Sequence, residues 1–284
     1  MTDTDQTRRP GPWDNLPPAV PAKPAEREIA RPRTDEPPLD KGQNPVWAVV
    51  STLLLGGFIW FVSGSWVIAV AAVWGLLVHE YGHVLAMNKL GMGPARIYII
   101  PFLGGVAKSQ RLPASEWHGV LVSLAGPAFG LLAAIPFFAL FLATGQGMWL
   151  QGVFAIALIN LVNLAPAPPL DGSKALGPVL ALIHPMVEKA AMVAIGAVVV
   201  LWGVTNGSYI FAAFLALALF GHLRRGAWRP DGRPLTWPEA GRSVGLFVVT
   251  AVACAAVGLA GLMPVTGSVG EALALGGSYF EFGR

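Results

Sequence analysis

The second long apolar segment of the chain, residues 66–88, carries two histidines and a glutamate near its C-terminal end, in the pattern His79-Glu80-x-x-His83. Histidines four residues apart lie on the same face of a helix, so both imidazoles can reach one metal ion. Ionisable groups are costly inside a membrane helix and mark functional sites there. The motif therefore predicts a metal-binding helix, with zinc as the expected ion.

Long apolar runs recur along the chain and indicate its fold class. Only 12% of the 284 residues are charged and 54% are hydrophobic, whereas soluble domains have about 25% charged residues. We expect an all-α, multi-pass membrane protein with six or seven transmembrane helices. The net charge of +3 is small and the basic residues lie in the connections, so a nucleic-acid role has no support.

Glycines, prolines and charged residues divide the apolar sequence into seven expected spans. They lie at about 46–63, 66–88, 117–142, 149–165, 187–204, 208–221 and 244–263. The stretch from Ile97 to Ala107 is also apolar, but it is too short to span and is interrupted by Pro101 and two glycines. We expect a short membrane-associated β-hairpin or re-entrant segment there.

The composition changes at both ends of this core. Residues 1–45 are rich in proline, mix acidic and basic side chains and lack the apolar run of a signal peptide, which predicts a disordered tail. The predicted core spans 46–221. An Arg-rich loop at 222–243 and a C-terminal transmembrane helix with a short tail at 244–284 are expected to follow it.

Basic residues indicate the orientation, because they collect in cytoplasmic connections. With the N-terminal tail in the cytoplasm, the cytoplasmic connections hold Lys89, Arg96, Lys108, Arg111, Lys174, Lys189, Arg224, Arg225, Arg229, Arg233 and Arg242. The opposite connections hold none, and only Arg284 falls outside. The sequence thus predicts a multi-pass protein of the cell membrane with a cytoplasmic N-terminus and its two motif histidines toward the cytoplasmic side.

A catalytic zinc site needs a third protein ligand. Of the four acidic residues between positions 46 and 221, Asp171 follows the fourth span after a proline-rich break, on the predicted side of His83. Such a break cannot continue a helix, and irregular backbone at membrane depth lines a cavity or is buried in protein. Asp171 is a candidate ligand on this ground, although a turn residue before Gly172 fits the sequence equally well.

Four motifs occur in a characteristic order: HEYGH at 79–83, Gly104-Gly105, Ala-Gly-Pro at 125–127, and NLAPAPPLDG at 163–172. In this order they resemble the site-2 protease family of intramembrane zinc metalloproteases, over about residues 66–185. The resemblance implies that His79, His83 and Asp171 bind Zn²⁺ and that Glu80 is the catalytic base. It thereby strengthens the assignment of Asp171.

The chain departs from the family pattern at two places. Gly130 stands where the family commonly has an asparagine, three residues after the proline of Ala-Gly-Pro. Ser173 and Lys174 replace the glycine and arginine that usually follow Leu-Asp-Gly. Neither departure changes an expected ligand.

The resemblance implies hydrolysis of peptide bonds in or near transmembrane segments of membrane-anchored proteins, such as transmembrane regulators. Because a helical substrate must unwind, the hairpin could accept it as an added strand, with Gly104 and Gly105 permitting close approach. A loop that only shields the metal is the alternative. Asn163 or Asn160 could donate a hydrogen bond to the reacting group, or could cap backbone groups.

Two other functional classes are compatible with parts of this sequence. A non-catalytic zinc-binding membrane protein would bind or sequester partners through the same ligands, and Glu80→Gln separates it from an enzyme, because only an enzyme would lose activity while keeping zinc. A transporter is disfavoured because ionisable residues inside the spans are confined to one cluster and the sequence shows no inverted repeat. The sequence leaves the oligomeric state open.

Overall fold

The computed structural model describes residues 40–101, 104–205, 207, 209–225 and 232–278. Contacts divide the chain after Leu39, and the unit that begins at Asp40 contains all the described elements. Most of the predicted disordered tail, 1–45, therefore lies outside the described residues, as does part of the predicted Arg-rich loop.

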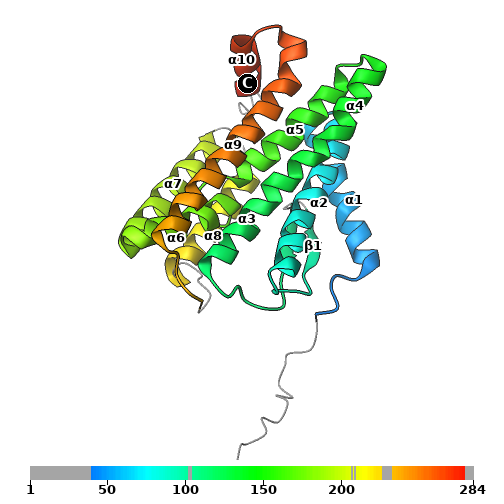
Figure 1. Ribbon diagram of the computed structural model, residues 1–284. Coiled ribbons are helices and arrows are strands. Elements are labelled where there is room, and N and C mark those ends of the chain that lie inside the picture. Colours follow the sequence, from blue (N-terminus) through cyan, green and yellow to red (C-terminus); the bar gives the residue numbers. More distant parts are fainter. Residues whose placement is uncertain (1–39, 102–103, 206, 208, 226–231, 279–284) are drawn as a thin grey trace, which may run out of the picture. The chain divides into compact units, whose positions relative to one another are not determined.

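The described residues are mainly helical, with one small antiparallel sheet between the second and third helices (Figure 1). In chain order the elements are α1 (Pro45–Ser63), α2 (Trp66–Lys89), β1 (Arg96–Ile100), β2 (Gly104–Lys108), α3 (Glu116–Gly130), the 3₁₀ turn η1 (Leu131–Ala134), α4 (Ile135–Thr144), α5 (Met148–Asn163), α6 (Asp171–Ile183), α7 (Pro185–Thr205), α8 (Tyr209–Arg225), α9 (Trp237–Thr266) and α10 (Val269–Ser278).

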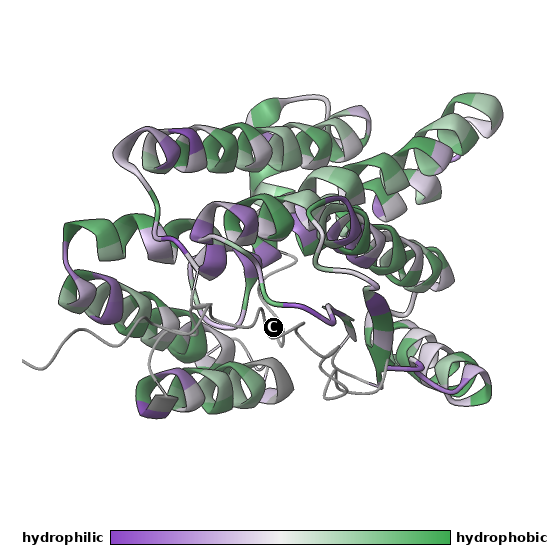
Figure 2. Ribbon diagram, turned by 60° about the horizontal axis from the view of Figure 1, so that its bottom comes forward, coloured by the Kyte–Doolittle hydropathy of each residue, from purple (hydrophilic) through white to green (hydrophobic). Residues whose placement is uncertain are grey.

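Five helical segments are long and apolar enough to cross a membrane: α1, α2, α3 continued through η1 into α4, α7 and α9. Two further helices, α5 and α8, contain apolar segments that are shorter. Together they correspond to the seven expected spans, and the all-α polytopic fold class is confirmed. In Figure 2 the helices are predominantly hydrophobic along their length.

Helix α2 packs closely against α3 and α5, and glycines allow the close approach. A Cβ atom on Gly75 would lie 2.9 Å from Cγ1 of Ile156 in α5. One on Gly82 would lie 2.8 Å from Cβ of Phe129 in α3. The helix that carries the histidine motif is therefore enclosed on two sides by neighbouring helices.

The expected β-hairpin is present. β1 and β2 pair antiparallel, with Arg96 opposite Lys108 and Ile100 opposite Gly104. Ile99 is buried while Ile100 is exposed, as expected for side chains that alternate between two faces. β1 contacts α1 and β2 contacts α2, so the hairpin bridges these two helices.

Three helical features differ from the sequence expectation. α9 begins at Trp237 rather than near 244, because Thr236 and Glu239 form a capping box and a proline occupies the first turn. Helix α6 begins at Asp171, directly after the proline-rich break. Helix α10 was not expected from the sequence. The long α9 packs against α5, α6 and α3, next to which it runs in Figure 1.

Candidate metal centre

The two motif histidines lie on the same face of α2 and are almost fully buried, with exposed fractions of 1% for His79 and 6% for His83. The outer ring nitrogen of each has a partner on another helix. Nδ1 of His79 lies 2.8 Å from Oδ1 of Asn160 in α5. Nδ1 of His83 lies 2.7 Å from the carbonyl oxygen of Val122 in α3. Such partners fix the orientation of metal-binding imidazoles.

These partners also determine which nitrogen carries the proton. The Val122 carbonyl can only accept, so His83 donates from Nδ1. The amide nitrogen of Asn160 donates to the Ile156 carbonyl at 2.8 Å, which leaves Oδ1 to accept from Nδ1 of His79. In the neutral form both histidines therefore keep a lone pair on Nε2.

Asp171 comes to the site from another helix, as the first residue of α6. The loop that precedes it is irregular but buried: Ala167 and Leu170 pack with Leu215 of α8 in one apolar cluster. Gly172 lies against the backbone of Leu164 and Ala165, where a Cβ would overlap it, so glycine lets the start of α6 fit against the end of α5. This arrangement delivers a carboxylate that is only 4% exposed.

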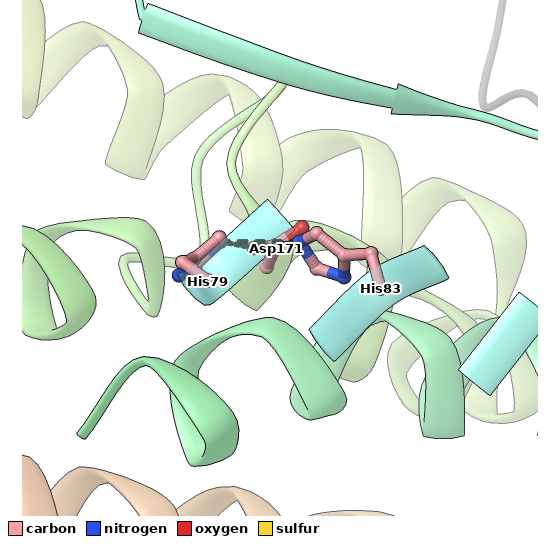
Figure 3. A group of neighbouring side chains, drawn as sticks. All are labelled: His79, His83 and Asp171. Carbon is pink, nitrogen blue, oxygen red and sulfur yellow. Dashed lines mark hydrogen bonds and ion pairs between the residues drawn. The ribbon is translucent and has the colours of Figure 1, made fainter. Parts of the chain in front are cut away.

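The three side chains converge, as Figure 3 shows. Oδ2 of Asp171 lies 3.1 Å from Nε2 of His79 and 3.2 Å from Nε2 of His83, and the two Nε2 atoms are 3.1 Å apart. Tetrahedral zinc with bonds of about 2.0–2.1 Å places its ligands about 3.3 Å apart. The donor types and their spacing thus fit a zinc ion.

The electrostatics of the cluster also favour a bound cation. With both Nε2 atoms unprotonated, two lone pairs and a carboxylate oxygen face one another at hydrogen-bond distance without a hydrogen to share. Such a group is favourable when a cation lies among the donors. Lys174 pairs with the other oxygen of Asp171 at 3.4 Å, so Oδ2 remains directed at the histidines.

Helix α3 packs against the side chains of the site through small residues. A Cβ on Gly126, the glycine of the Ala-Gly-Pro motif, would overlap the His83 ring and lie 2.7 Å from Nε2 of His79. A Cβ on Gly130 would overlap the side chain of Asn160, with Cγ at 2.7 Å. Gly130, where the family commonly has asparagine, thus makes room for an asparagine that arrives from α5.

Glu80 is also buried, and strand β2 lies directly against it. A Cβ on Gly105 would lie 2.6 Å from Cγ and 3.3 Å from Oε1 of Glu80. Only a glycine lets the strand backbone approach the carboxylate this closely. The neighbouring Gly104 has a φ of +114°, and a Cβ on it would lie 3.6 Å from Cδ2 of Leu76. Both glycines singled out in the sequence therefore belong to the strand beside the motif.

The structure gives the two candidate asparagines different surroundings. Asn160 is fully buried and holds His79, a role that the sequence did not predict. Asn163 donates from Nδ2 to the Ile159 carbonyl of its own helix at 3.0 Å. A role of Asn163 in substrate binding stays a prediction. The signal for Asn160 was its polarity in an apolar helix, but its partner lies 81 positions away.

Comparison with known families supplies an independent finding. The family model described as peptidase family M50, the site-2 protease family, matches residues 67–156. The resemblance to the site-2 proteases is confirmed. A search of curated proteins gave no match.

The match covers both histidines, Glu80 and the Ala-Gly-Pro motif, and it ends before Asp171. It supports a multi-pass membrane metalloprotease of the site-2 protease kind, and this family consists of zinc metalloproteases. The aspartate is added by the geometry alone, because Asp171 is the acidic residue that joins the two histidines among the described residues.

Proposed function

We propose that the protein is an intramembrane zinc metalloprotease that hydrolyses peptide bonds in or near transmembrane segments of membrane-anchored proteins. The observation that carries the proposal is the position of β2 on Glu80, beside the convergent donors of His79, His83 and Asp171. This position brings together three features: a buried base, a ligand set with the spacing of zinc, and a strand edge that can present a peptide.

His79, His83 and Asp171 would hold the metal. A zinc ion so bound supplies a Lewis acid for a peptide carbonyl and an acidified water with a pKa of about 7. Glu80 takes a proton from the attacking water as the C–O bond forms. It then returns this proton to the amine nitrogen as the C–N bond breaks. Burial of Glu80 keeps bulk water from competing for the proton.

The substrate would bind as an extended segment. A helical transmembrane segment hides its peptide groups in its own hydrogen bonds, so it must unwind before cleavage. Strand addition to the hairpin replaces those hydrogen bonds and sets the peptide alongside β2, the strand that contacts Glu80. Gly104 and Gly105 are accordingly proposed as substrate-contact residues.

We propose that the protein spans a cell membrane with its N-terminus in the cytoplasm. The metal site then lies toward the cytoplasmic side of the bilayer. The distribution of lysine and arginine between alternate connections supports this orientation. A cysteine-labelling map of the connections, with a membrane-impermeant reagent on intact cells and on inverted vesicles, tests it.

The test of the proposed function uses the protein in liposomes with a fluorogenic single-span peptide that carries a Gly-Pro break in its apolar segment. Glu80→Gln keeps the size of the side chain and removes the base, so it should retain zinc and lose cleavage. Tyr81→Phe is the matched control on the same turn, since Tyr81 is 53% exposed. Cleavage by Glu80→Gln at the wild-type rate would contradict the proposal, and zinc binding without cleavage in the wild type would favour the non-catalytic alternative.

A further inference from the structure

A side chain from the segment before α1 pairs with the hairpin in the manner of a strand. Oε1 of Gln43 accepts from the backbone N–H of Ile99 at 2.8 Å, and Nε2 donates to the carbonyl of the same residue at 2.9 Å. These are the two hydrogen bonds that a neighbouring strand residue would make. The amide of Gln43 thus occupies the edge of β1 at Ile99.

The pairing register shows which edge is left. Ile99 stands opposite Gly105. Because the backbone groups of Ile99 point to Gln43, this is a pair without mutual hydrogen bonds, and the N–H and C=O of Gly105 point away from β1. Within the described part of the chain, these groups of Gly105 have no backbone hydrogen-bond partner outside the hairpin. They lie on the strand that contacts Glu80.

Several contacts hold Gln43 in this position. Gly42 adopts a left-handed conformation with a φ of +84°, and its N–H donates to Oδ1 of Asp40 at 3.0 Å, which turns the chain toward the hairpin. Asp40 pairs with Lys108 of β2 at 3.3 Å. Nε2 of Gln43 also lies 3.4 Å from Oγ of the buried Ser51 in α1. The segment 40–43 therefore ties α1 to both strands.

We propose that Gln43 is a positioning residue for the substrate, because it closes the edge of β1 and leaves the edge of β2 as the place where an extended peptide joins the hairpin. A peptide on β2 lies about 4.8 Å from the strand that contacts Glu80, whereas a peptide on β1 would lie about 9.6 Å from it. Only the first can bring its scissile peptide group to the site that Glu80 and the metal ligands form. The inference rests on the proposed function.

Two cysteine reporters distinguish the edges. Val106 on β2 and Ile100 on β1 are 47% and 39% exposed. Each is changed to cysteine in a Cys254→Ala, Glu80→Gln background, and disulfide formation is measured with the Gly-Pro probe peptide carrying one cysteine beside its break. With Gln43 present, Val106→Cys should cross-link and Ile100→Cys should not. With Gln43→Ala, cross-linking at Ile100→Cys should appear.

Kinetics on the enzyme with Glu80 intact complete the test. Gln43→Ala should lower kcat and KM for the probe together and leave kcat/KM near the wild-type value, because a peptide held on β1 is bound without being cleaved. Zinc content should stay at the wild-type value. Lys41→Ala, which removes an exposed side chain in the same segment, is the matched control and should leave cleavage unchanged.

The outcomes separate the two proposals. Cleavage and cross-linking that are the same in Gln43→Ala and wild type would overturn the role of Gln43 and leave the protease proposal standing. Zinc loss in Gln43→Ala would overturn it as well, because the residue would then support the fold rather than the edge. A wild-type protein that neither cleaves nor cross-links the probe would overturn both.

Discussion

The two halves of the candidate metal centre are held in different ways. His79 and His83 lie within one helix, their outer nitrogens are bonded to α5 and α3, and the glycine contacts of α2 leave them little room to move. Asp171 opens a short helix after an irregular loop, and its second oxygen meets Lys174, whose side chain is 60% exposed. The histidine half is a rigid platform, whereas the aspartate half depends on how α6 is braced.

The two halves of the metal centre also differ in their position relative to the segment that matches the family. The histidines and their packing partners in α3 lie inside the segment that matches the family, whereas Asp171 and two of the helices that pack on α6, namely α7 and α9, lie beyond it. Changes in the platform should therefore have large effects on metal binding, and changes around α6 smaller ones.

The largest effect is expected from Gly126→Ala. Its Cβ would overlap the His83 ring and crowd Nε2 of His79, so the ligands must separate. Overpacking of this kind costs about 1–3 kcal/mol of stability. We expect loss of bound zinc and a lower unfolding temperature in detergent. Gly119→Ala, on the same helix with open space around it, should keep its zinc, and equal zinc loss in both variants would contradict the packing argument.

Asn160→Ala tests whether the platform depends on its hydrogen bonds. Without Oδ1 of Asn160, nothing from α5 holds the proton on Nδ1 of His79, and loss of such a partner weakens metal binding about 10- to 100-fold. Competition with a fluorescent chelator measures the affinity. Asn163→Ala is the control. Among the described residues Asn163 bonds the Ile159 carbonyl of its own helix and no metal ligand, so the zinc affinity of this variant should equal that of the wild type.

Ser243→Ala removes a hydrogen bond that holds α6, the helix of Asp171, against α9. Oγ of Ser243 in α9 donates to the Ala175 carbonyl of α6 at 2.8 Å, in a buried position. Its loss should lower the free energy of unfolding by about 0.5–1.5 kcal/mol, with zinc still bound. Thr250→Val removes a bond of α9 to its own Leu246 carbonyl. A fall in stability as large for Thr250→Val would show that the contact between α9 and α6 is not what matters.

Lys174→Ala should have the smallest effect. The ion pair with Asp171 involves an exposed lysine, and such pairs contribute about 0.2–1 kcal/mol. Zinc affinity should therefore change by no more than about fivefold, and the change should shrink as the salt concentration rises. Titrations at about 0.1 M and 1 M salt check this. A change as large as that of Asn160→Ala would mean that the lysine belongs to the rigid platform.

Those parts of the fold that depend on local sequence were predictable. Apolar runs of membrane length gave the spans, and the glycines and Pro101 within a short apolar stretch gave the hairpin. The early start of α9 was missed because charged residues hide its first turns, although Thr236-x-x-Glu239 is a capping-box signature. The helix beginning at Asp171 was missed because a proline-rich run precedes it.

The candidate site also has parts that the local sequence predicts and parts that it does not. The spacing of His79 and His83 along one helix was sufficient to bring them together, and the structure adds Asp171 to them. The pairing of Asn160 with His79 and of Gln43 with Ile99 joins residues 81 and 56 positions apart. Such long-range contacts depend on the packing of whole helices, which no local pattern in one sequence specifies.

The metal centre is tested most directly by the zinc content of the detergent-purified protein, measured by mass spectrometry for the wild type, His79→Ala and Asp171→Ala. We expect about one zinc ion per wild-type chain and its loss in both variants, because each removes one of three convergent donors. Zinc that stays bound to Asp171→Ala at the wild-type level would contradict the assignment of the aspartate and with it the His2Asp centre.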